Sequence, residues 1–240
     1  MMTFAVAGHA YGNPESFTSS IYPPFLNQLK NDTKSSLLFL TGDVVAHPTL
    51  ENWDKVKSEL DSLDLPWYIA PGNHDISPYM DQKIQSQRYL SIKSNNNLFL
   101  VLNTCFAGWS VDSAQIKFIE NELKSAKEYH NIFVFSHQLW WEKNPPSKFE
   151  LDSLRPNSFA LYDGETSFWQ TAFPLFANLK QSVYFFAGDM GCHHSLPSYY
   201  EDHYQNFHFY GSGMGGGIAD NYLRISVYEY GSVKIERIDF

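Results

Sequence analysis

The sequence has few of the features that mark secreted, membrane-spanning or nucleic-acid-binding proteins. Its 240 residues include 2 cysteines, Cys105 and Cys192, which are too few for a disulfide framework. Lys and Arg number 17 against 26 Asp and Glu, so the formal net charge of −9 gives no overall basic field for nucleic acid or anionic lipid. No apolar run approaches the ~20 residues of a membrane span, and the chain does not open with a basic region and a long apolar run. We therefore expect a cytoplasmic protein without a nucleic acid partner, although an exported mature form would share these features.

The remaining composition indicates one large folded domain. Hydrophobic residues make up 43% and aromatic residues 17% of the chain, which rules out disorder as its general state. This length accommodates one α/β domain with a large core and is too short to require two. We expect a single domain over residues 1–240.

Short apolar runs alternate with helical patterns along the chain. The alternation predicts an α/β fold, with buried strands over 3–7, 37–40, 67–70, 98–102, 132–135 and 183–187. Apolar residues at helical spacing predict helices over 50–63 and 114–123, the second with Asp112 or Ser113 as N-cap. Residues 222–230 and 233–238, around Gly231 and Ser232, indicate an antiparallel hairpin.

One segment, 138–169, has little periodicity and is too long for an ordinary connection. It carries many aromatic and proline residues: Trp140, Trp141, Pro145, Pro146, Phe149, Pro156, Phe159, Tyr162 and Trp169. We interpret it as an insertion or cap loop, and two roles stay open. Its aromatics could form a wall for a sugar, a nucleoside or another flat or apolar part of a substrate, or they could plug one end of the sheets.

Polar side chains follow three of the predicted strands. Gly42 and Asp43 follow the run over 37–41, the sequence Gly72-Asn73-His74-Asp75 follows 66–70, and His137 ends 132–136. Taken singly, these residues could be turn formers, with Asp75 as a helix N-cap. As an ordered set they favour a ligand site, because open α/β sheets bind ligands at strand ends.

The ordered set resembles the motifs of the calcineurin-like metallophosphoesterases, and the resemblance covers nearly the whole chain. It implies a four-layer αββα sandwich of two mixed β-sheets flanked by helices, and hydrolysis of phosphoester bonds with water activated by divalent metal ions. Carried over by position, the resemblance makes Asp43 the bridging carboxylate, and Asn73 and His137 metal ligands. It places His74 beside the phosphoryl group as an acid or charge stabiliser.

The chain departs from the family pattern at both ends. Where the family has Asp-x-His after the first strand, this chain has Ala7-Gly8-His9, and where the family has Gly-His-x-His it has Gly188-Asp189-Met190-Gly191. In the scheme that the resemblance implies, the losses at Ala7 and Gly191 fall on the same metal, whereas the replacement at Asp189 falls on the other metal and is still a competent ligand. We therefore expect one divalent ion (Mn, Fe, Zn or Mg). Its expected ligands are Asp43, Asn73, His137 and Asp189, and the expected catalytic residues are His74 and His9.

Two alternatives concern the last motif. Cys192, His193 or His194 could swing inward and restore the missing ligands, because Gly191 gives the loop freedom. The glycine-rich stretch over 211–217 could let backbone amides approach an anion, which is weak support for a phosphate cradle.

Three classes of function follow. The first is a metal-dependent phosphatase or phosphodiesterase acting on a small phosphorylated substrate, with glycan-like and nucleotide-like substrates both open. The second is a catalytically degenerate module that binds a phosphorylated or glycan ligand, which the missing carboxylate at Ala7 favours. The third is ester or acyl hydrolysis at the same cleft. A serine nucleophile lacks support, because no Gly-x-Ser-x-Gly elbow is present.

Overall fold

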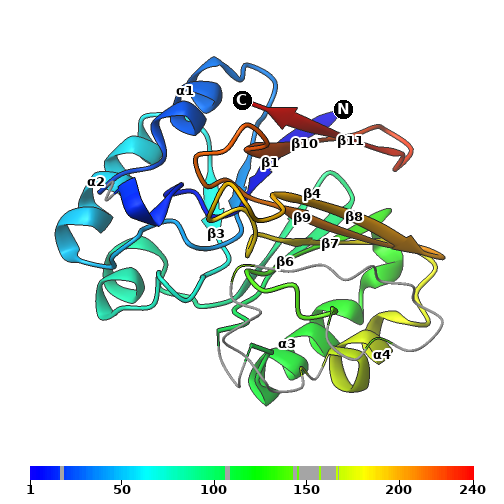
Figure 1. Cartoon of the computed structure of the whole chain (residues 1–240). Helices are drawn as coiled ribbons and strands as arrows, with labels where there is room; N and C mark the ends of the chain where they lie inside the picture. The colour runs from blue at the N-terminus through cyan, green and yellow to red at the C-terminus, as the bar shows by residue number, and fades with distance from the viewer. Residues whose placement is uncertain (17–18, 106–108, 143–144, 146–156, 158–165, 167) are drawn as a thin grey trace.

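The computed structural model of the chain describes all residues except 17–18, 106–108, 143–144, 146–156, 158–165 and 167, and it contains two packed β-sheets (Figure 1). The first sheet has the order β11 (Val233–Asp239), β10 (Asn221–Val227), β1 (Met2–Ala7), β2 (Leu38–Leu40) and β3 (Trp67–Ile69). Strands β1, β2 and β3 are parallel, and β10 is antiparallel to both β1 and β11.

The second sheet has six strands, in the order β4 (Leu90–Ser94), β5 (Asn97–Val101), β6 (Asn131–Phe135), β7 (Ser182–Ala187), β9 (Phe207–Ser212) and β8 (Tyr199–Tyr204). Its four central strands are parallel, and the edge strands β4 and β8 are antiparallel to their neighbours.

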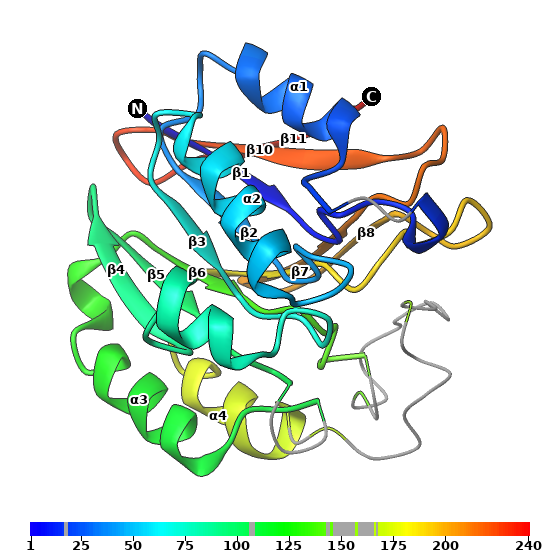
Figure 2. The ribbon, with the colours of Figure 1, turned by 90° about the vertical axis from the view of Figure 1, so that its left-hand side faces the viewer.

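Helices cover the outer face of each sheet (Figures 1 and 2). Helices α1 (Pro23–Asn31) and α2 (Leu50–Asp61) lie on the first sheet, and α3 (Ser113–Leu123) and α4 (Phe173–Phe176) lie on the second. Short 3₁₀ helices at Pro14–Ser16 and Ala126–Glu128 and π-helices at Met80–Ile84 and Phe168–Ala172 complete the helical elements. The predicted four-layer sandwich of two mixed sheets flanked by helices is confirmed. None of the helices in the described ranges is both long and apolar enough to cross a membrane.

Stacked aromatic rings fill the space between the sheets. Phe39 of β2 and Phe135 of β6 stack with ring centroids 4.0 Å apart, and Phe4, Phe99 and Phe133 pack around them. Because helices cover the other face of each sheet, the central strands are buried on both faces. They therefore read as continuous apolar runs rather than as alternating patterns.

Most of the predicted elements are present within a residue or two. The carboxylate of Asp112 accepts a hydrogen bond from the Gln115 backbone at 2.9 Å and so caps α3, and Thr49 caps α2 in the same way. The hairpin of β10 and β11 is also confirmed.

The described part of the 138–169 segment packs into the hydrophobic core between the second sheet and the helices α3 and α4. Trp140, Trp141 and Trp169 are buried there, and the Trp169 indole N–H donates to the Trp141 carbonyl at 2.7 Å. These three tryptophans are part of the hydrophobic core on the outer face of the second sheet. Other aromatics and prolines of the segment lie outside the described residues: Pro146, Phe149, Pro156, Phe159 and Tyr162.

Candidate active site

The candidate residues follow the carboxyl ends of parallel strands from both sheets. His9 follows β1, Asp43 follows β2, Asn73 and His74 follow β3, and in the second sheet His137 and Asp189 follow β6 and β7. Contacts between their side chains join the two sheets at this edge.

Asp43 lies at the centre of these contacts and is only 3% exposed. Its Oδ2 is 3.6 Å from His9 Nε2, and its Oδ1 is 3.4 Å from His137 Nε2. The Asp43 Oδ1 also accepts a hydrogen bond from the His74 backbone N–H at 3.1 Å. One carboxylate thus contacts all three candidate histidines.

The rings of the three histidines are oriented in the same way, by a hydrogen bond between Nδ1 and a backbone carbonyl oxygen. The Nδ1 atoms of His9, His137 and His74 lie 3.0, 2.9 and 2.9 Å from the backbone carbonyl oxygens of Gly12, Thr41 and Ala46, respectively. A carbonyl oxygen only accepts, so each Nδ1 donates and each neutral ring presents the Nε2 lone pair. Histidines that bind metal ions commonly fix their other ring nitrogen in this way.

His137 Nε2 is the atom that best matches a metal ligand. It is buried and has no hydrogen-bond partner among the described residues, and it lies 3.4 Å from Asp43 Oδ1 and 3.7 Å from Asp189 Oδ1. These separations are long for hydrogen bonds. Two donors that each lie ~2.1 Å from one ion are separated by ~3.0–3.5 Å, so the spacing is close to that of shared ligands.

The donors are arranged in pairs rather than in a closed cage. Among the described residues, no group of three or more His, Cys, Asp or Glu side chains encloses a metal position. His137 is nevertheless common to the pairs with Asp43 and Asp189. The chemistry of the donors therefore fits a divalent ion, while their geometry is more open than a finished metal site.

The charges around His137 favour a cation at Nε2. Burial lowers the pKa of His137, but the carboxylates of Asp43 and Asp189 outweigh burial and raise that pKa above its usual value. At His9 burial dominates, and it lowers the pKa to about 4. Burial and the charge of Asp43 raise the pKa of Asp75 to about 6. Two buried carboxylates beside a single imidazole thus attract a proton or a metal ion.

The four residues after β3 have different surroundings. Asn73 is exposed, and no hydrogen bond within the described part of the chain fixes its amide. Asp75 is fully buried and accepts hydrogen bonds from the backbone N–H groups of Val44 at 2.8 Å, Val45 at 3.2 Å and Gly72 at 2.8 Å. Asp75 therefore connects the loops after β2 and β3 instead of capping a helix.

Ala7 and Gly191, the two positions at which metal ligands of the family are missing, both lie in the described part of the chain. Ala7 packs in the apolar layer beneath α1 and α2, and His9 is the residue after β1 that faces Asp43. Gly191 has φ 76°, and a Cβ built there would lie 3.0 Å from Ser198 Cβ and 3.1 Å from the Gly213 carbonyl carbon. A larger residue at Gly191 would therefore require the loop to move.

The residues proposed as substitutes for the lost ligands have other surroundings. Burial, followed by the charges of Asp189 and Asp43, raises the pKa of Cys192 to about 11, which disfavours a thiolate. His193 Nδ1 lies 2.8 Å from Ser195 Oγ, and the His193 and His194 rings are 3.9 Å apart. Both histidines line a pocket of about 350 Å³ beside Gly191. None of the three forms an ion pair with Asp43 or Asp189 in the described ranges.

The glycine-rich stretch carries its own anion. The backbone N–H groups of Gly215, Gly216 and Gly217 donate to the Asp220 carboxylate at 2.8, 2.9 and 3.2 Å. The amides that could have cradled a phosphate are therefore already bonded within the turn.

Sequence reasoning missed Tyr11. Its ring is 1% exposed and lies 4.3 Å from the His9 ring and 5.4 Å from the His74 ring, between centroids. A lone tyrosine in a loop gives no signal in the sequence, because only the fold brings it to both histidines.

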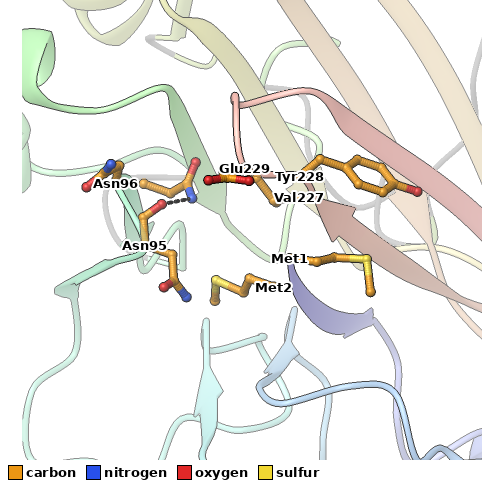
Figure 3. Close-up of a pocket in the computed structure, with 8 residues that line it drawn as sticks. Met1, Met2, Asn95, Asn96, Val227, Tyr228 and Glu229 are labelled. Atoms are coloured by element: carbon orange, nitrogen blue, oxygen red, sulfur yellow. Dashed lines mark hydrogen bonds between the residues drawn. The ribbon is translucent and has the colours of Figure 1, made fainter.

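A separate pocket of about 410 Å³ lies at the opposite end of β1 (Figure 3). It is formed by the chain start and the β4–β5 and β10–β11 turns, with Met1, Asn95 and Glu229 among its lining residues. No histidine lines it in the described part of the chain, so its volume does not mark the site of the chemistry.

The chain is similar in sequence to proteins named as phosphodiesterases. The family model for calcineurin-like phosphoesterases matches residues 12–171. The chain is 35% identical over 77 residues to a probable glycerophosphodiester phosphodiesterase GpdQ of Arcobacter nitrofigilis, a match over 32% of this chain and 27% of that protein. It is 28% identical over 108 residues to a 3',5'-cyclic-nucleotide phosphodiesterase of Nostoc sp., over 42% of this chain and 40% of that protein.

These matches span less than half the length of either relative. Among solved structures, that of PhoD superposes with a TM-score of 0.59 at 10% identity, covering 98% of this chain and 68% of that one. This last similarity concerns the fold.

Proposed function

Because the chain belongs to the calcineurin-like phosphoesterase family, we propose that it hydrolyses phosphoester bonds of a small substrate at the edge where β1, β2, β3, β6 and β7 end. One observation carries the proposal: the buried His137 Nε2 has no hydrogen-bond partner among the described residues and lies between the carboxylates of Asp43 and Asp189. A buried polar atom without a partner is costly unless a ligand satisfies it.

We assign the metal ligands to Asp43, His137 and Asp189, with the exposed amide of Asn73 as a further oxygen donor, and we propose one divalent ion per chain. Mn, Fe, Zn and Mg all accept imidazole or carboxylate donors. When bound, such an ion lowers the pKa of water and polarises a phosphoryl oxygen. The pairing of His137 with both carboxylates supports this assignment.

His74 and His9 act on the substrate in this proposal. His74 is held by its backbone N–H on Asp43 and by Nδ1 on the Ala46 carbonyl, so its Nε2 is left for the substrate. In its protonated form it donates to a phosphoryl oxygen or to the leaving alcohol. His9 presents Nε2 on the other side of Asp43 and accepts a hydrogen bond from water or substrate.

A second candidate function is binding of a phosphorylated or glycan ligand without hydrolysis. The open arrangement of the donors favours it, since no three of the described His, Cys, Asp and Glu side chains enclose a metal position. In either case we propose the cytoplasm as the compartment, because Cys105 and Cys192 are both free thiols.

The test compares Asp43→Asn and His137→Ala with the unaltered protein in Mn²⁺, using para-nitrophenyl phosphate and bis(para-nitrophenyl) phosphate. We expect the unaltered protein to hydrolyse at least one of them and each variant to lose ~10²–10⁴-fold in rate. Asp202→Asn, on β8 away from the site, is the matched control and should keep full activity.

Tight Mn²⁺ and phosphate binding without hydrolysis would favour the binding function. Hydrolysis that survives both site substitutions would contradict the assignment of Asp43 and His137.

A further inference from the structure

A short polar segment, residues 103–105, follows β5 at the same edge as the candidate site. Strand β5 is parallel to β6, so the residues after it lie beside His137, which follows β6. The buried side chain of Gln115 on α3 accepts a hydrogen bond from the Asn103 backbone N–H at 2.9 Å and donates to the Asn103 carbonyl at 2.8 Å. The Cys105 N–H then donates to Asn103 Oδ1 at 3.0 Å. Helix α3 therefore fixes the backbone of this segment.

The side chains of Thr104 and Cys105 bond to Gln138, the residue after His137. The Gln138 backbone N–H donates to Thr104 Oγ1 at 3.2 Å, and the Thr104 hydroxyl donates to Gln138 Oε1. Gln138 Nε2 donates to Cys105 Sγ at 3.6 Å. The thiol donates in turn to the Pro71 carbonyl at 3.3 Å, which is nearer than Gln138 Oε1 at 3.9 Å. The donor and acceptor roles are consistent along the whole chain of bonds.

Burial makes these bonds a connected unit. Thr104 and Gln138 are buried, and Cys105 is only partly exposed. Burial also raises the pKa of the Cys105 thiol, so the thiol keeps the proton that it donates to Pro71. A buried donor or acceptor that loses its partner costs free energy, so the loss of one side chain disturbs the bonds next to it.

The chain of bonds ends on the loop that carries Asn73 and His74. Pro71 precedes these residues, and its carbonyl is the only hydrogen-bonding group of its backbone, since proline has no N–H. The loop follows β3 of the first sheet, whereas Cys105 follows β5 of the second. At its other end the His74 N–H donates to Asp43 Oδ1 at 3.1 Å. The loop is therefore held by both sheets, through Asp43 on one side and Cys105 on the other.

We propose that Cys105 and Gln138 are positioning residues of the reaction, which act through Pro71 to hold His74 in place relative to His137. Neither residue touches the substrate, and no bond to either forms or breaks. Placement of this kind matters because a shift of ~1 Å in a reacting group costs on the order of 10²-fold in rate. The inference rests on the proposed function, and it adds two residues that stand in none of the recognised motifs.

The test uses substitutions that break or keep single bonds. Cys105→Ala removes the donor to Pro71, and Cys105→Ser keeps a donor at the same position. Gln138→Ala removes both ends of the amide. Asn97→Ala is the matched control, because Asn131 Nδ2 donates to Asn97 Oδ1 at 3.0 Å where β6 and β5 begin, at the opposite end of the same two strands. The control thus removes a buried amide contact far from the site.

The first measurement is amide hydrogen exchange by NMR in metal-free buffer, which reports on the loop without any reaction. The N–H groups of Gly72, His74 and Asp75 are all hydrogen-bonded within the site. We expect their exchange to be about tenfold faster in Cys105→Ala and Gln138→Ala, as for the loss of one hydrogen bond. The serine variant and the control should exchange at nearly the rate of the parent.

The second measurement is kcat and KM in Mn²⁺ for the better of the two chromogenic esters. We expect kcat of Cys105→Ala to fall about 10- to 10²-fold with little change in KM, and Cys105→Ser to recover most of the loss. Asn97→Ala should keep the kcat of the parent. In a His74→Ala background, Cys105→Ala should cause little further loss, because the residue that it positions is already gone.

The outcomes separate this inference from the proposed function. Unchanged amide exchange in Cys105→Ala, or faster exchange without a loss of kcat, would overturn the inference while hydrolysis by the parent stands. A loss of kcat equally large in the His74→Ala background would also overturn it, since the effect would not pass through His74. If the parent hydrolyses neither ester, the proposed function fails, and amide exchange alone decides whether Cys105 and Gln138 hold the loop.

Discussion

Two non-glycine residues with left-handed backbone conformations meet in the site. His9 has φ 56° and Asp43 has φ 53°, and their side chains approach to 3.6 Å. Such conformations cost on the order of 1–3 kcal/mol each and persist where surrounding contacts hold them. The His9 N–H donates to the Gly42 carbonyl at 3.0 Å, which ties the two turns together. The strained backbone thus aims both side chains at one point.

The position of His9 leads to a prediction about the second ion. Because His9 faces Asp43 and Ala7 packs among apolar residues, we expect His9→Asp, not Ala7→Asp, to add Mn²⁺ affinity beside Asp43. Ala7→Asp should instead lower the free energy of unfolding by about 3 kcal/mol, since it buries a charge without a partner. Calorimetric Mn²⁺ titration and urea unfolding of the two variants test this. Extra Mn²⁺ bound by Ala7→Asp would contradict it.

The residue level also shows what the sequence could reveal of the site. Asp43, His74 and His137 stand in motifs at strand ends, so their convergence could be predicted from topology alone. The role of Asp75 could not, because its three backbone partners come from two loops whose approach depends on packing between strands. The position of Tyr11 could not be predicted either, because only packing in the folded chain brings its ring to His9 and His74.

At the level of elements, the strands that can be recognised from the sequence are those buried on both faces, because nearly every residue in them is apolar. Strands β1, β5, β6 and β7 are long apolar runs because sheet and helices cover them. Strand β8 reads Tyr-Tyr-Glu-Asp-His-Tyr, since it is an edge strand with exposed side chains, and it gave no apolar signal. Helix α1 has only nine residues, begins with Pro23 and Pro24 and buries Phe25 and Leu29, so it offers few apolar positions from which a helix could be predicted.

The pairing of β8 with β9 predicts a dependence of stability on pH. Burial of His208 on β9 lowers its pKa; His203, opposite on β8, lowers it further, while Glu201 raises it. The unfolded histidine, with a pKa near 6.5, then binds protons more readily than the folded one. The contribution of His208 to stability is therefore present above pH ~6.5 and lost as the pH falls below that value.

We expect His208→Phe to reduce the loss of unfolding free energy between pH 7 and pH 5, as measured by urea unfolding at a series of pH values. His47→Asn removes an exposed histidine and is the control, with a pH profile like that of the parent. An unchanged profile in His208→Phe would count against this account.

At the scale of the whole molecule, the proposed ion would be bound by residues that follow strands of both sheets. Asp43 belongs to the first sheet, and His137 and Asp189 belong to the second, so an ion bound to all three would connect the two halves of the sandwich. A ligand that binds only the folded state adds stability by mass action.

We therefore expect Mn²⁺ to raise the unfolding free energy of the parent by about 2.7 kcal/mol at 100 times its dissociation constant. Asp43→Asn should remove most of this gain, and a chelator should reverse it. Elemental analysis after dialysis should give one ion per chain. Two ions per chain, or equal stabilisation of Asp43→Asn, would argue against the single site.

The turn closed by Asp220 has a consequence for selectivity. Its carboxylate accepts hydrogen bonds from all three glycine amides, so a free phosphate would have to displace a group attached to the same loop in order to bind them. We therefore expect a phosphorylated ligand to bind at the edge around Asp43 in preference to this turn.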